Sequence, residues 1–175
     1  MTKALSLVLF ISLTVMSFKS IQAQETDIVK IDSVSGKEIL VGAVTREGLQ
    51  NFGEWFDANY ETYSPDSDVI KKLMDNTNKL PEIFVVLATW CGDSREHVPH
   101  FFKIIDQIGY PEQKIFMVSV DRSKKGGDFC LADFNINLVP TFIFTRGGEE
   151  IGRIIEAPET TLENDLLKIV TGANN

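Results

Sequence analysis

The stretch IFVVLATWCGDSREHVPHFFKIIDQIG, residues 83–109, decides the fold of this 175-residue chain. Its first five residues are apolar and mostly β-branched, and a run this short before turn-forming residues indicates a buried strand. After Gly-Asp-Ser, apolar residues recur at the spacing that lines one face of an α-helix. These residues are Val98, Phe101, Phe102, Ile105 and Ile108. Cys91 is therefore expected where a buried strand passes into a helix N-terminus.

A thiol in this position has a physical reason to be reactive. The unpaired N–H groups and the positive end of the helix dipole stabilise an anion there, and the thiolate is the nucleophilic form of cysteine. Nearby charges act in both directions, because Asp93 opposes a negative sulfur whereas Arg95 favours it. We expect the helix terminus to dominate, and so we expect Cys91 to react faster with disulfides than an ordinary thiol.

The five residues that follow the predicted strand form a motif: Trp90, Cys91, Gly92, Asp93 and Ser94. This WCGDS motif resembles the WCGPC active-site loop of thioredoxins, with an aspartate for the proline and a serine for the second cysteine. Pro99 stands eight residues after the motif's cysteine, as does the proline that kinks the active-site helix of thioredoxins. The resemblance implies that Cys91 and Ser94 occupy the catalytic positions, flanked by substrate-binding residues of the same motif.

A second loop carries the same resemblance. The segment LVPTFIF, residues 138–144, looks like the loop that bears the family's cis-proline. The resemblance therefore implies a cis bond between Val139 and Pro140, close to Cys91, and a peptide-binding groove shaped by these two residues. It covers about residues 67–171 and suggests a small exported bacterial thioredoxin-like protein with CxxS in place of CxxC.

The implied fold class is α/β: a thioredoxin-like three-layer sandwich whose mixed central sheet has helices on both faces. The order of elements in the sequence agrees with this fold. Beyond the strand and helix of residues 83–109, we expect helices near 67–76 and 129–134, strands near 114–120, 141–145 and 151–156, and a final helix. A capping box of Thr160 and Glu163 is expected to begin that final helix.

The N-terminal part of the chain divides into two segments. Residues 1–23 combine a positive start with an uncharged, mostly apolar run and a small residue, Ala23, at a plausible cleavage point. This pattern predicts a secretory signal peptide, so we expect an exported protein, periplasmic or secreted, that is not inserted in a membrane after processing. Residues 24–66 are expected to form an N-terminal strand and helix extension, and residues 67–175 the thioredoxin-like domain.

Two local patterns describe the extension. Extended runs on either side of Ser35-Gly36-Lys37 predict a β-hairpin. Thr45 is a suitable cap for one helix, whose apolar face would be formed by Leu49, Phe52, Phe56 and Tyr60.

Composition limits the partners. The chain carries 25 acidic and 17 basic residues, a formal net charge of −8, which makes nucleic acid or an anionic membrane surface a poor partner. We expect a monomer that needs no cofactor and acts on thiol- or disulfide-containing proteins or on small thiols.

The departures from thioredoxins limit the expected chemistry. In a dithiol thioredoxin the first cysteine attacks a disulfide and the second resolves the mixed disulfide. Ser94 is close enough on the helix to hydrogen-bond the Cys91 sulfur, but it cannot form a sulfur–sulfur bond. Val85 replaces the buried aspartate that thioredoxins commonly carry six residues before the first cysteine. Exchange is therefore expected to stop at the mixed disulfide unless another thiol arrives.

Cys130 is the other cysteine of the chain and a candidate resolving thiol. The alternative, which we favour, is a buried apolar cysteine. A disulfide needs Cα atoms within about 7 Å, and the implied fold does not obviously bring Cys130 so close to Cys91.

His97 and His100 raise the hypothesis of a metal site with Cys91. His97 is about 9 Å further along the helix axis and more than half a turn around it, and the sequence offers no evident third ligand. We therefore expect a solvated helix face and no metal. Three functions remain open: monothiol exchange through Cys91, a non-catalytic module that binds extended peptides, and, with less support, a metallochaperone.

Overall fold

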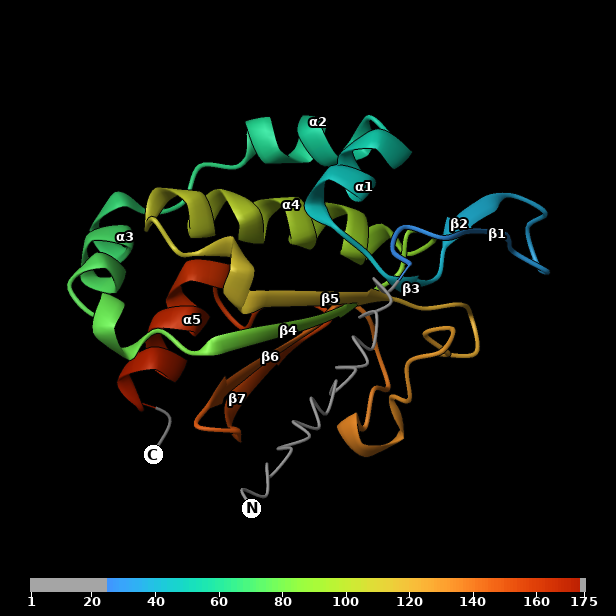
Figure 1. Ribbon diagram of the computed structural model, residues 1–175. Coiled ribbons are helices and arrows are strands. Elements are labelled where there is room, and N and C mark those ends of the chain that lie inside the picture. Colours follow the sequence, from blue (N-terminus) through green and yellow to red (C-terminus); the bar gives the residue numbers. More distant parts are fainter. Residues whose placement is uncertain (1–24, 174–175) are drawn as a thin grey trace, which may run out of the picture.

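The centre of the molecule is a five-stranded mixed sheet with the order β3-β5-β4-β6-β7, in a computed structural model that describes residues 25–173 (Figure 1). β4 is parallel to β5, and the other neighbouring pairs are antiparallel. The strands are β3 (Gly42–Ala43), β4 (Glu82–Leu87), β5 (Ile115–Ser119), β6 (Thr141–Arg146) and β7 (Glu149–Ile155). The strands predicted for the core region are therefore present, close to their predicted limits.

One face of the sheet packs against α-helices. Because side chains alternate along a strand, Ile83, Val85 and Leu87 of β4 point to this face, where they join the main core. The helices that complete this core are α3 (Ser67–Met74), α4 (Gly92–Gln107) and α5 (Leu162–Thr171). Within residues 25–173, no helix has the length and apolar character required to cross a bilayer.

The opposite face has a different cover. Val86 of β4 packs there in a smaller core with Leu131 and Val139, which belong to the segment between β5 and β6. The helical part of that segment is a single 3-10 turn, η3 (Ala132–Phe134). Phe116 of β5 remains 45% exposed on this face, so the cover is incomplete near the start of β4 and β5.

The predicted hairpin in the extension is confirmed. β1 (Val29–Ile31) pairs with β2 (Glu38–Leu40) outside the main sheet. Gly42 then adopts a φ of 107°, which glycine tolerates without a Cβ clash, and the chain enters the main sheet as β3 against β5. The extension is thus joined to the sheet beside the C-terminal end of β5.

The single helix expected after Thr45 is two helices. Thr45 caps the first, as predicted, by accepting a hydrogen bond from the Gly48 N–H at 2.9 Å. The helices are α1 (Arg46–Phe52) and α2 (Trp55–Thr62). Gly53 separates them in an extended conformation, and a Cβ at this position would lie 2.7 Å from the Trp55 ring. α2 packs along the outer side of α4, so the extension adds a further helical layer (Figure 1).

The capping box predicted for the last helix is wrong by one residue. Thr161, rather than Thr160, caps α5. Glu163 does not close a box; it accepts hydrogen bonds from the Tyr63 hydroxyl at 2.6 Å and from the Asp66 N–H at 3.1 Å. Glu163 therefore ties the loop before α3 to α5.

Candidate functional site

Cys91 lies at the junction that the sequence predicted. β4 ends at Leu87, and Cys91 is the N-cap residue of α4 in an extended backbone conformation. Its side chain is partly exposed, while the next residue, Gly92, is exposed and would place a Cβ in open space. A reacting group can therefore approach the sulfur from the Gly92 side.

The immediate surroundings of the sulfur differ from expectation. The Cys91 thiol donates to the Val139 carbonyl oxygen at 3.2 Å and lies 3.7 Å from a carboxylate oxygen of Asp93. No helix N–H donates to the side chain of this N-cap residue, and Arg95 instead donates to the Thr89 carbonyl at 2.6 Å. Both of these neighbours of the sulfur are hydrogen-bond acceptors, and the thiol hydrogen points to one of them, the Val139 carbonyl.

The expected cis-proline loop is present beside the sulfur. The Val139–Pro140 peptide bond is cis, and the Cys91–Val139 contact places it at the N-terminal end of α4, as predicted. Both residues are buried, whereas Leu138 is 44% exposed. Val139 therefore presents backbone to the site, and Leu138 is the exposed apolar side chain of the loop that sequence reasoning missed.

Ser94 does not act as expected on the sulfur. Its side chain is fully buried, and its hydroxyl accepts a hydrogen bond from the Ala88 N–H at 3.1 Å. Among the described residues, no hydrogen bond joins it to Cys91. Ser94 thus fastens the start of α4 to the chain just after β4.

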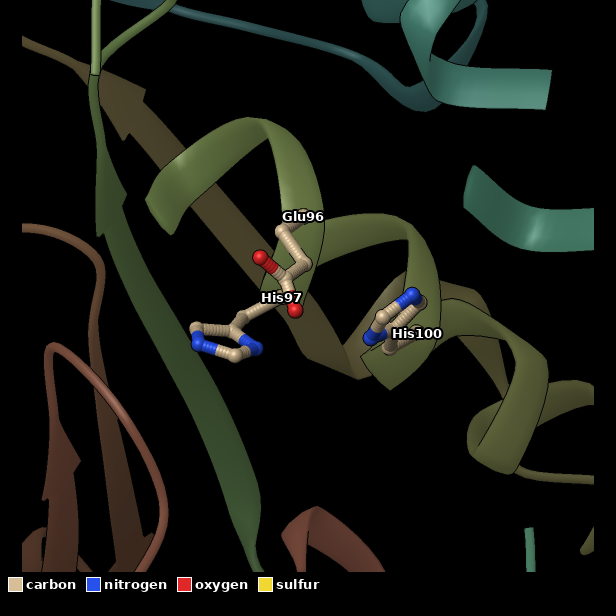
Figure 2. Close-up of side chains that lie close together, drawn as sticks. All are labelled: Glu96, His97 and His100. Atoms are coloured by element: carbon tan, nitrogen blue, oxygen red, sulfur yellow. The ribbon is translucent and has the colours of Figure 1, made fainter. Parts of the chain in front are cut away.

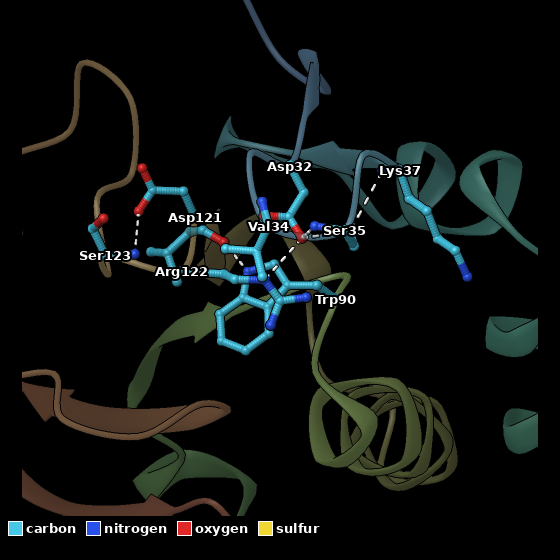
Figure 3. Close-up of polar contacts among 9 residues, drawn as sticks. Asp32, Val34, Ser35, Lys37, Trp90, Asp121, Arg122 and Ser123 are labelled. Carbon is cyan, nitrogen blue, oxygen red and sulfur yellow. Dashed lines mark hydrogen bonds and ion pairs between the residues drawn. The ribbon is translucent and has the colours of Figure 1, made fainter.

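Trp90 is held by contacts that sequence reasoning did not find (Figure 3). Its indole N–H donates to the Val120 carbonyl at 2.8 Å. Two cations from the loop after β5 lie over its ring: the Arg122 guanidinium at 4.7 Å and the Lys124 ammonium at 4.9 Å from the centroid. Such cation–π contacts are worth about 0.5–1 kcal/mol at exposed sites, and here they fix the residue next to Cys91.

The hairpin of the extension secures this arrangement. Asp32, in the turn between β1 and β2, accepts a hydrogen bond from Arg122 at 2.8 Å and is only 3% exposed. Hydrogen bonding from Ser35, aided by Arg122, lowers the pKa of Asp32 to about 2. Leu40 also donates to the Thr89 hydroxyl at 3.0 Å. Sequence reasoning had no signal for a contact between residues 90 positions apart.

Cys130 is not the buried cysteine that we favoured. It is exposed, and both Cys130 and Cys91 are free thiols. Cys130 lines an apolar groove of about 480 Å³ on the second face of the sheet, together with Phe84 and Phe116 near the start of β4 and β5. Cys91 follows the other end of β4, and six residues of strand span about 16 Å. The structure therefore keeps Cys130 away from the sulfur of Cys91.

One further group of polar side chains lies on α4. Glu96, His97 and His100 bring their ligand atoms within 4.8 Å of one another (Figure 2). Sequence reasoning considered the two histidines with Cys91 and found no third ligand. The adjacent glutamate supplies it, and Cys91 is not part of the group.

The family model described as Thioredoxin matches residues 69–168. A mitochondrial thioredoxin O of Oryza sativa subsp. japonica is 35% identical over 88 residues, which cover 50% of this chain and 48% of that protein. Mitochondrial thioredoxin-3 of Saccharomyces cerevisiae is 31% identical over 96 residues, covering 55% of this chain and 69% of that protein.

The chain also has a match among solved structures. The crystal structure of oxidised thioredoxin O1 from Arabidopsis thaliana aligns with a TM-score of 0.37 and 29% identity, covering 55% of this chain and 82% of that chain. The chain spans about half the length of the rice relative and 42% of the curated Arabidopsis thioredoxin O1. The family match covers the region from α3 to α5, and the predicted α/β thioredoxin fold class is confirmed. The expected α-helices lie on one face of the sheet, whereas the other face is covered by the β5–β6 segment with its 3-10 turn.

Proposed function

Because this chain belongs to the thioredoxin family, we propose that it performs thiol–disulfide exchange through the single cysteine of its WCGDS motif. The Cys91 sulfur attacks one sulfur of a substrate disulfide, a new sulfur–sulfur bond forms, and the old bond breaks. The departing thiolate takes up a proton, so the products are a mixed disulfide on Cys91 and one free thiol. The substrates are disulfide-containing proteins or small disulfides.

The placement of Cys91 is the observation that supports this proposal. It is partly exposed at the N-cap of α4 and lies 3.2 Å from the carbonyl that precedes Pro140. A substrate chain bound beside this loop would bring its sulfur into line with the thiol. With serine at position 94 and Cys130 on another face, a second thiol from outside the chain must release the product.

The serine at position 94 favours one alternative function, a module that binds peptides without turnover. Since Ser94 cannot attack a mixed disulfide, the site is also suited to binding an extended peptide against Leu138 and Val139 without turnover. In that case, Cys91 would contact the partner but not exchange with it. Covalent capture separates the two functions.

The capture experiment uses oxidised glutathione and intact-mass measurement. In a Cys130→Ser chain, we expect one adduct, removed by a second substitution of Cys91→Ser. Peptide mapping of the wild-type chain is needed because Cys130 is also exposed. An absence of adduct on Cys91, under conditions in which Cys130 reacts, would support the binding module and contradict exchange.

We also propose that the protein is exported and processed after Ala23. The support is the charge and hydropathy pattern of residues 1–23, a segment outside the described residues. The mass of the protein recovered from its native compartment measures this directly. A chain that retains residues 1–23, recovered with the membrane fraction, would contradict export and cleavage.

A further inference from the structure

We propose that Glu96, His97 and His100 form a divalent-metal site on α4 that is independent of the Cys91 thiol and binds Zn²⁺. The group lies within one turn and a half of the helix, and all three side chains belong to the same element (Figure 2). Imidazole nitrogen and carboxylate oxygen are ordinary zinc ligands. This inference does not depend on the exchange chemistry proposed above.

The distances suit a single ion. The ligand atoms lie within 4.8 Å of one another, and two ligands at about 2.1 Å from zinc can be at most about 4.2 Å apart. Side-chain rotation can bring the ligand atoms from within 4.8 Å to this shorter distance, and Glu96 is exposed to solvent. The two imidazole rings have centroids 6.1 Å apart and planes at 66°, so they do not stack face to face and block each other's nitrogens.

The ligand atoms are available. Among residues 25–173, no hydrogen bond or ion pair with another protein group engages the side chains of Glu96, His97 or His100. The neighbouring cation, Arg95, is turned away to the Thr89 carbonyl. Two imidazoles and a carboxylate thus share a small volume without hydrogen-bond or ion-pair partners in the described part of the chain.

One ligand is held in place before any metal arrives. The His100 ring stacks on Tyr63 with centroids 4.2 Å apart and planes at 11°. Tyr63 is itself fixed by donating to Glu163 at 2.6 Å. A ligand that is already ordered loses less conformational freedom when the ion binds, which increases affinity.

The ligand count indicates the kind of site. Closed structural zinc sites have four protein ligands, whereas three protein ligands leave a position for water or another group. Glu96, His97 and His100 therefore make an open, exchangeable site rather than a structural one. Because it involves side chains on either side of Pro99, which lacks a helix-forming N–H, bound metal would also tie together the turn that proline weakens.

The test is a titration of the untagged, full-length protein with zinc chloride, followed by calorimetry and by NMR of the imidazole nitrogens. His97 and His100 are the only histidines in the sequence, so both ring signals are assigned to the proposed site. We expect one Zn²⁺ per chain and perturbation of both rings. Glu96→Gln and His97→Gln should each weaken binding at least about tenfold, the smaller loss known for removing an outer-shell partner.

Two control variants make the result specific. Glu47→Gln changes an exposed glutamate on α1 that makes no side-chain hydrogen bond or ion pair within residues 25–173. Cys91→Ser removes the thiol, and both variants should bind zinc as the wild type does. Binding that disappears in Cys91→Ser would assign the metal to the thiol and overturn the proposal. Absence of binding in the wild type, or binding unchanged in both Glu96→Gln and His97→Gln, would also overturn it.

Discussion

At the scale of single residues, the surroundings of the Cys91 sulfur set its reactivity. The sulfur lies near a carbonyl and near the Asp93 carboxylate, and neither contact stabilises a negative sulfur. The dipole of α4 acts in the opposite direction. The balance between the helix and Asp93 can be measured because Asp93 is exposed and its removal should leave the fold intact.

Asp93→Asn should accelerate the reaction of Cys91 with a small disulfide. A charge about 4 Å away is worth about 1 kcal/mol in water, or about fivefold in rate at low salt. The difference should shrink as salt increases. Rates are measured near pH 6 in a Cys130→Ser background, with Glu47→Gln as the control for loss of one exposed carboxylate. A slower reaction in Asp93→Asn would mean that this carboxylate accepts the thiol proton.

Ser94→Cys should create a dithiol. The substituted side chain is buried one turn after Cys91, at the position where the family's second cysteine stands. We expect an internal disulfide by mass and new activity in an insulin reduction assay, which Ser94→Ala should lack. Loss of the hydrogen bond to Ala88 should cost about 1 kcal/mol of stability. Because Val85 is not an acid, the activity should remain below that of a thioredoxin. Failure of the two thiols to join would contradict the assigned geometry.

At the scale of elements, the β1-β2 hairpin acts on the site through Asp32 and Arg122. The pKa of Asp32 is lowered to about 2, compared with about 3.9 for an unfolded aspartate. The folded state is therefore stabilised by its ionisation above about pH 4, and this contribution is lost as the pH falls from about 4 to 2. Asp32→Asn should remove this part of the pH dependence.

Urea unfolding of the wild type and Asp32→Asn, compared at several pH values, measures that effect. We expect their stabilities to differ at neutral pH and to converge near pH 2. The control is Asp128→Asn, which changes an exposed aspartate whose side chain has no hydrogen bond or ion pair to another described residue. A constant difference across the whole range would show that the ionisation of Asp32 does not stabilise the fold.

Arg122→Gln tests the contact with Trp90 itself. The chain has two tryptophans, so the measurement uses a Trp55→Phe background in which Trp90 is the only one left. Loss of the guanidinium over the ring should increase acrylamide quenching of Trp90 fluorescence. Lys125→Gln is the control for loss of one exposed cation from the same loop. Equal quenching in the Trp55→Phe chain with and without Arg122→Gln would contradict the proposal that Arg122 holds the Trp90 ring in place.

The elements also show where sequence reasoning works. Apolar periodicity located β4, α4 and the strands around them because burial on one face imposes that pattern. It joined α1 and α2 into one helix because the apolar spacing continues through Gly53, while the break depends on how the Trp55 ring packs. The predicted cap of α5 is one residue too early, because Thr161 and not Thr160 is the N-cap. Glu163, which was expected to complete the capping box, instead accepts a hydrogen bond from Tyr63, 100 residues earlier in the chain.

At the scale of the whole molecule, the site is built from three distant parts of the chain. The WCGDS motif and the Pro140 loop were both found in the sequence, because each has a local pattern. The hairpin contact from Asp32 and the exposure of Cys130 were not, because they depend on tertiary packing that no local spacing encodes. The approach of Glu96 to His100 was also missed, although the i, i+4 spacing of these two residues on α4 is a local signal for it.

The distance between the two cysteines decides whether one chain can complete the exchange. Cys130 lines the groove near the start of β4, and Cys91 lies beyond the other end of that strand. A disulfide between them requires Cα atoms within about 7 Å, so the second cysteine should not resolve an adduct formed on the first. We therefore expect a mixed disulfide on Cys91 to persist.

The most direct test is the lifetime of the Cys91–glutathione adduct, followed by intact mass after free thiols are removed. The adduct should persist equally in the wild type and in Cys130→Ser, and added reduced thiol should release it from both. Rapid loss in the wild type with formation of a Cys91–Cys130 disulfide, and no such loss in Cys130→Ser, would contradict the account.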